Sequence, residues 1–142
     1  MIGFDIKQCF FDRQAVISRA DAATRKVLSK FGAFVRRTAK GSIRNRHKPA
    51  PPGSPPSSHT GLLKKFIFFG YDAGARSVVI GPARLDSRGR GDAPSLLEHG
   101  GATTLKRRGR RRRAAYWARP YMGPAFDKEQ PKLPTMWRDS VK

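Results

Sequence analysis

The chain has 142 residues, and its 30 lysines and arginines against 10 aspartates and glutamates give a formal net charge of +20. This length predicts one domain, residues 1–142, with a modest core. So large a positive charge repels itself in a compact monomer and favours a polyanionic neighbour, either nucleic acid or an acidic protein face. The single cysteine, Cys9, excludes an internal disulfide framework and fits a reducing cytoplasm. No apolar run reaches membrane-spanning length, so a soluble protein without a membrane partner is expected.

The first predicted element is a long amphipathic helix over about residues 12–44. Apolar residues recur there at spacings of three and four, without a proline to interrupt them. A helix of ~30 residues would be about 45 Å long, more than so small a domain covers by itself. Gly32 weakens its middle by about 1 kcal/mol relative to alanine and allows a bend or break. The helix packs either wholly on its own sheet or partly on a neighbouring subunit.

Residues 45–59 are predicted to form an extended arm. Five prolines in this segment argue against both helix and sheet and favour polyproline geometry. Most such segments are connectors, but in a ring-forming protein the arm could lie across the next subunit.

Two runs rich in aromatic and β-branched residues follow, at 64–71 and 76–80. The turn residues of 72–75 between them predict an antiparallel hairpin. Residues 82–93 are expected to form a flexible loop, and residues 94–99 a short helical turn.

A second strand pair is predicted at 102–106 and 114–118, and its connection is the strongest electrostatic feature of the chain. Residues 106–113 carry seven cations in eight residues and are expected to form an exposed, flexible hairpin loop with Gly109 near its tip. This loop is either solvated or a contact to a polyanion, which could be the phosphate backbone of DNA or an acidic protein face. Base stacking is not expected, because no aromatic residue is interleaved. The candidate contact residues are Lys106, Arg107, Arg108, Arg110, Arg111, Arg112 and Arg113.

The tail from Pro124 is predicted to be helical in parts, interrupted at Pro131 and Pro134. The whole pattern predicts an α+β fold: a long N-terminal helix packed on a small antiparallel sheet of two hairpins, with a C-terminal helical segment.

Residues that could support catalysis are few and scattered. His47, His59 and His99 stand far apart in the sequence and Cys9 stands alone, so neither a metal site nor a cofactor is expected. No nucleophile elbow or phosphate-binding glycine loop is present either. The sequence therefore predicts a protein that is not an enzyme. A nuclease would require acids or histidines to converge around a metal.

Two ordered segments in the C-terminal half carry the most specific signal. The first, residues 96–101, reads Leu-Leu-Glu-His-Gly-Gly, and the second, residues 118–126, reads Ala-Arg-Pro-Tyr-Met-Gly-Pro-Ala-Phe. Pro120 ends a strand, and Pro124 suits the first turn of a following helix. An ion pair between Glu98 and Arg119 would hold the turn before the second hairpin.

Together with Thr60-Gly61-Leu62 and the valine-rich Val78–Gly81, these segments resemble the tail-component family of tailed bacteriophages. The resemblance covers roughly residues 10–140. Two features depart from the family pattern: Gly101-Ala102 stands where a threonine usually follows the glycine directly, and the arginine-rich run is not typical of the family.

The resemblance implies a virion structural protein that joins or completes the tail at the head–tail connection. It implies a homo-oligomeric ring, six-fold like a tail tube, which contacts connector and tail-tube proteins and could also contact packaged DNA. Its place would be the virion neck, and the host cytoplasm during assembly. Charge alone favours an alternative, a nucleic-acid-binding module such as a ribosome-associated protein. The residues to which the resemblance assigns structural roles are Thr60, Gly61, Leu62, Gly81, Glu98, Gly100, Arg119, Pro120, Tyr121, Pro124 and Ala125.

Overall fold

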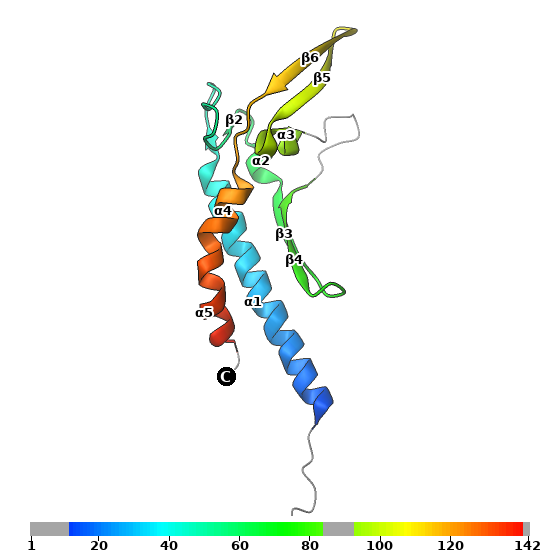
Figure 1. The fold of residues 1–142 in the computed structure, drawn as a ribbon, viewed down its shortest axis with the longest axis vertical. Helices are drawn as coiled ribbons and strands as arrows, with labels where there is room; N and C mark the ends of the chain where they lie inside the picture. Colours follow the sequence, from blue (N-terminus) through cyan, green and yellow to red (C-terminus); the bar gives the residue numbers. More distant parts are fainter. Residues whose placement is uncertain (1–11, 84–92, 141–142) are drawn as a thin grey trace, which may run out of the picture.

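The computed structural model describes residues 12–83 and 93–140, which form an elongated molecule built around one long helix (Figure 1). The α+β class is confirmed. In chain order the elements are α1 (Arg13–Ser42), β1 (Arg44–Asn45), β2 (Ser57–Ser58), α2 (Leu62–Lys65), β3 (Ile67–Asp72), β4 (Ser77–Pro82), α3 (Ala93–His99), β5 (Gly101–Arg107), β6 (Arg110–Tyr116), α4 (Met122–Glu129), a 3-10 turn (Gln130–Lys132) and α5 (Leu133–Arg138).

Helix α1 matches the predicted helix closely. Asp12 caps its start, because the carboxylate accepts the backbone N–H of Ala15 at 3.0 Å. Gly32 does not break the helix. Instead, a β-carbon on Gly32 would lie 2.8 Å from Cγ2 of Val78 in β4. The glycine therefore lets the β3–β4 hairpin approach the helix backbone closely.

The two predicted hairpins both form, but as separate two-stranded sheets and not as one sheet. Hairpin β3–β4 packs along α1, whereas β5–β6 projects away from it (Figure 1). Strand β3 begins at Ile67, later than expected, because Leu62–Lys65 form a helical turn. Gly61, with φ of 73°, precedes this turn, and its carbonyl accepts the N–H of Lys65.

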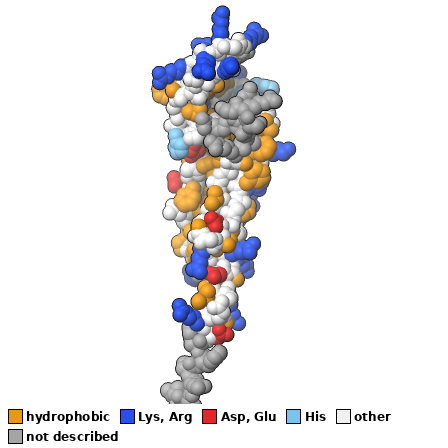
Figure 2. Space-filling view, turned by 90° about the vertical axis from the view of Figure 1, so that its right-hand side faces the viewer, with side chains coloured by type: hydrophobic (Ala, Val, Ile, Leu, Met, Phe, Trp, Pro, Cys, Tyr) orange, Lys and Arg blue, Asp and Glu red, His pale blue; other side chains and the backbone are white. Residues whose placement is uncertain are grey.

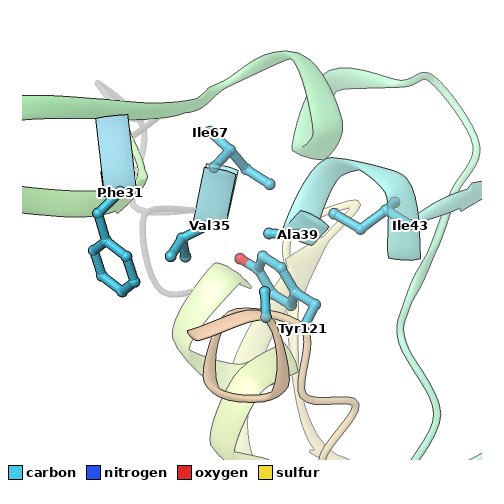
Figure 3. Packing of buried hydrophobic residues seen from close by; sticks show 7 residues of the cluster. Phe31, Val35, Ala39, Ile43, Ile67 and Tyr121 are labelled. Carbon is cyan, nitrogen blue, oxygen red and sulfur yellow. The ribbon is translucent and has the colours of Figure 1, made fainter. Parts of the chain in front are cut away.

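The core lies where α1 is covered on two sides, by β3–β4 and by α4–α5 (Figure 1). Figure 3 shows α1 side chains between Ile67 of β3 and Tyr121, which precedes α4. Full burial of one such side chain contributes about 1.5–3 kcal/mol. The buried cluster consists of Phe31, Val35, Ala39, Ile43, Ile67, Tyr121 and Ala125.

Polar contacts hold the two covering layers on α1. Arg36 Nε donates to the carbonyl of Ile67 at 2.7 Å, and Thr38 Oγ1 donates to Oε1 of Glu129 at 2.7 Å. Glu129 is buried, and hydrogen bonds from Lys132 and Thr38 lower the pKa of its carboxyl. The carboxylate is therefore kept ionised at the interface between α1 and α4.

The proline-rich segment is not the freely extended arm expected from its composition. Its ends are joined by the parallel pairing of β1 with β2, and in between Gly53 donates its N–H to the carbonyl of Ala118 at 2.8 Å. Ala50 and Pro56 are buried against the rest of the chain. The segment is thus a closed loop held on its own domain.

The C-terminal tail follows the prediction, since the interruptions coincide with Pro131 and Pro134 at the starts of the 3-10 turn and α5. The expected loop at 82–93 falls mostly outside the described residues, as does Cys9. Within the described residues, no helix is long and apolar enough to cross a membrane.

Candidate functional site

The two C-terminal segments singled out in the sequence meet at the start of α4. The Glu98 carboxylate accepts three consecutive backbone N–H groups, from Tyr121 at 2.9 Å, Met122 at 3.0 Å and Gly123 at 2.8 Å. The first N–H groups of a helix have no partner within it, and the helix dipole favours a negative charge there. Glu98 of α3 therefore caps α4 across more than twenty residues of sequence.

The expected ion pair between Glu98 and Arg119 is wrong. Arg119 binds backbone carbonyls instead: its Nε donates to Ala50 at 2.8 Å, and its own N–H donates to Leu97 at 2.6 Å. Glu98 is already occupied by the N-terminus of α4, which explains why the guanidinium lies elsewhere. Arg119 thus joins three parts of the chain: the proline-rich loop, α3 and the segment before α4.

Gly100, which follows α3, is required because two segments of the chain pack closely there. Gly100 has φ of 72°, and a β-carbon there would lie 2.9 Å from the backbone nitrogen of Ala118. The positive φ disfavours residues other than glycine, and the short distance leaves no room for a β-carbon. Gly100 therefore lets the chain leave α3 directly against the segment that enters α4.

Tyr121 anchors this junction in the core, with a side chain that is 1% exposed. Burial, together with the nearby charge of Glu98, raises the pKa of its phenol to about 12. Pro120 precedes it, and Ala125, one turn into α4, is buried beside the same cluster. Pro124 stands in the first turn of α4, where its missing N–H leaves no gap in the helix.

The other residues of the resemblance lie apart from this junction. Thr60 Oγ1 accepts the N–H of Leu62 at 3.4 Å at the start of α2, and the Leu62 side chain is exposed. Gly81 pairs with Phe68 in the β3–β4 hairpin. The motif residues thus lie in two places, the α2–β3 entry with its hairpin and the α3–α4 junction.

The basic run differs most from its prediction. It forms the ends of two strands, and only Arg108 and Gly109 lie in the turn. Both have positive φ, 48° and 79°, as in the type I′ turns that close two-residue hairpins. Gly109 is at the tip as predicted, but the flexible loop expected at 106–113 is a regular hairpin end.

The strand register places the cations on both faces of this hairpin. Lys106 pairs with Arg111 and Leu105 with Arg112. Since neighbouring residues of a strand point to opposite faces, Arg111 and Arg113 occupy one face and Arg110 and Arg112 the other. Like charges that are directly opposite repel each other, so the arrangement is unfavourable unless an anion relieves it.

No carboxylate relieves this charge within the part of the chain that the structure describes. Lys106, Arg108 and Arg110–Arg113 are exposed, and none of them is in an ion pair. Figure 2 shows lysines and arginines gathered at the end of the molecule where the hairpin projects. Between this basic end and α3 the strands carry small neutral residues such as Ala102 and Ala115.

The histidines are less scattered than the sequence suggested. His47 and His59 flank the closed proline-rich loop, and their ring centroids are 6.4 Å apart. Over residues 12–83 and 93–140 no three histidines, cysteines or acids come together as a metal site would require.

Sequence reasoning missed two features of the surface. The pairing of the basic run as the ends of two strands could have been inferred from Arg108-Gly109, which suits a two-residue turn. The exposed apolar side chains of β3–β4 were also missed, where Phe68 is 49% and Val79 66% exposed.

Comparison of the chain with protein-family models, with curated proteins and with solved structures found no match.

Proposed function

We propose that this chain is a structural subunit of a tailed bacteriophage that joins or completes the tail at the head–tail connection. The observation that carries the proposal is the junction of residues 96–101 with 118–126, the two segments on which the resemblance chiefly depends. Glu98 caps α4, and Arg119 ties the same junction to the proline-rich loop. Glu98 and Arg119, which belong to the segments that carry the resemblance, therefore hold parts of this chain together.

In this proposal the chain assembles as a homo-oligomeric ring of six copies in the virion neck. Two surfaces are available for contacts between copies. The first turns of α1 expose Val16 and Ile17, and the β3–β4 hairpin exposes Phe68 and Val79. Contacts between two different surfaces close into a ring when the rotation per subunit fits. The ring faces would meet connector and tail-tube proteins.

A map of the assembled particle tests the proposal directly. A closed ring of this chain is expected between head and tail, and a single copy or none at the neck would contradict it. In solution, Val79→Thr keeps the shape of the strand residue but makes it polar, so ring formation on the connector should weaken. Leu105→Thr, a change of another exposed apolar residue on the other hairpin, is the matched control.

The proposal gives the chain no catalytic step. Replacing His47, His59 and His99 together by glutamine should leave particle assembly intact. A metal-dependent nuclease activity that this triple replacement abolishes would count against a structural role.

A second candidate is a nucleic-acid-binding module, for example a ribosome-associated protein. The exposed cations of β5–β6, which make no ion pair among the described residues, favour it. The genes beside that of this chain separate the two candidates, since portal, capsid and tail genes are expected for the first. The basic hairpin alone does not separate them, because DNA in the neck would also give it a polyanion in the first candidate.

A further inference from the structure

We propose that the β5–β6 hairpin binds duplex DNA by inserting its basic end into the major groove, with phosphates on both sides of the ribbon. This inference rests on the polyanion contact proposed for the hairpin and specifies its ligand and its geometry.

The distribution of charge over two faces is the first argument. Arg111 and Arg113 lie on one face of the ribbon and Arg110 and Arg112 on the other. A flat acidic protein surface, or a single phosphate backbone, can neutralise only one face. The cations of the other face would then remain close together without a counter-charge. A groove of duplex DNA presents a phosphate backbone along each of its two walls.

The dimensions of the hairpin also fit a groove. The major groove is about 12 Å wide and about 8.5 Å deep, and it admits a two-stranded β-ribbon. Strand residues rise about 3.4 Å each, so the four cation-bearing pairs from Thr104–Arg113 to Arg107–Arg110 extend about 14 Å. The outer pairs would therefore lie within the depth of the groove, and Arg113 would lie at its edge, where the phosphates are.

The part of the hairpin behind the basic end keeps the insertion free of obstruction. The register pairs Ala102 with Ala115 and Thr103 with Ala114, so this section carries small neutral side chains. Figure 1 shows that the hairpin projects beyond α2 and α3, which leaves its tip accessible. The turn at Arg108 and Gly109 is the outermost part and would enter first.

Two matched double variants test the two-sided contact. Arg111→Gln with Arg113→Gln removes two charges from one face, and Arg110→Gln with Arg112→Gln removes two from the other. Each pair should weaken binding to a duplex of about 25 base pairs and reduce the salt slope by up to about 1.8, since each phosphate that is no longer bound accounts for about 0.9. Arg19→Gln with Arg25→Gln on α1 removes the same charge far from the hairpin and should change the slope much less. Thermal melts of all variants establish that they fold, and threonine versions keep the strand propensity if glutamine disturbs it.

The groove itself is tested with a duplex whose cytosines carry glucosylated 5-hydroxymethyl groups, which fill the major groove. Binding to this duplex should weaken about tenfold or more, whereas a minor-groove ligand such as distamycin should have little effect. An effect of one face pair only, or equal binding to both duplexes, would overturn groove insertion. Binding of poly-glutamate as tightly as duplex DNA would assign the hairpin to an acidic protein instead.

The experiments distinguish a failure of groove binding from a failure of the proposed function. If neither face pair differs from the α1 control, the hairpin is not a polyanion contact, and the inference is overturned. Ring formation at the neck is read independently, from the particle map.

Discussion

The carboxylate of Glu98 lies 2.8 Å from the backbone nitrogen of Gly123 and thereby fixes the start of α4 on α3. A β-carbon on Gly123 would lie 3.2 Å from the same carboxylate, so the helix start and the acid are closely fitted. The contact explains why an acid and a glycine 25 positions apart belong to one structural unit.

We therefore expect Glu98→Ala to destabilise the protein. It removes the acceptor of three N–H groups and a negative charge at a helix N-terminus, so the free energy of unfolding should fall by about 1–3 kcal/mol. Chemical denaturation measures this, and Glu98→Gln should fall in between. Asp127→Asn, a change of an exposed acid on α4 itself, is the control. If Glu98→Ala is no less stable than this control, the cap contributes nothing.

Two glycines of α1 should respond to alanine in opposite directions. At Gly41 nothing lies within 4 Å of a new β-carbon, so Gly41→Ala should stabilise the helix by up to about 1 kcal/mol. At Gly32 the same change meets Val78 at 2.8 Å and Phe69 at 2.9 Å and should destabilise the protein by about 1–3 kcal/mol. Thermal melts give both values, and Val78→Ala should partly compensate Gly32→Ala. Equal effects at the two sites would mean that β3–β4 does not pack closely on the helix.

Tyr121 should make stability depend on alkaline pH. The phenol of the folded protein has a pKa of about 12, whereas an unfolded tyrosine titrates near pH 10. Between these values the folded state binds more protons than the unfolded state. The stabilising contribution of the phenol is therefore complete below about pH 10 and is lost as pH rises toward 12. Tyr121→Phe should flatten this dependence, as measured by denaturation between about pH 9 and pH 11. Tyr116→Phe on the exposed hairpin is the matched control.

One substitution should replace the repulsion between opposed cations on β5–β6 by an attraction. Arg111 faces Lys106, so Arg111→Glu should create a cross-strand pair and stabilise the hairpin by about 0.2–1 kcal/mol at low salt. Arg113→Glu changes the charge equally but faces Thr104, so the gain should be smaller. Amide hydrogen exchange in β5 measures the gain in stability of each variant. A gain that persists in about 1 M salt would not be electrostatic.

Local patterns were enough to predict most elements of the fold. The spacing of apolar residues predicted α1 almost to its ends, and prolines predicted the interruptions of the tail. These features depend on neighbouring residues. The attachment of the proline-rich segment depends instead on the hydrogen bond from Gly53 to Ala118, a contact between distant positions that composition does not encode.

The sequence predicted which residues belong to the candidate site but not how they are arranged. The basic residues were identified, yet their order as two paired strands depends on cross-strand register, which overrides the low β-propensity of a basic run. Glu98 was recognised as important, but its partners were not. Backbone N–H groups carry no sequence signature, whereas Arg119 was an obvious and incorrect choice of partner.

The closed proline-rich loop has a further consequence, which concerns the chain before it folds. Five prolines restrict the unfolded ensemble of this segment, so joining its ends through β1 and β2 loses less conformational entropy than an ordinary loop of this length would. This helps a two-residue bridge, the hydrogen bonds from Gly53 and Arg119, and the burial of Ala50 and Pro56 to hold the loop. Replacing prolines by glycine at exposed positions such as Pro52 would remove no buried side chain and still loosen the loop.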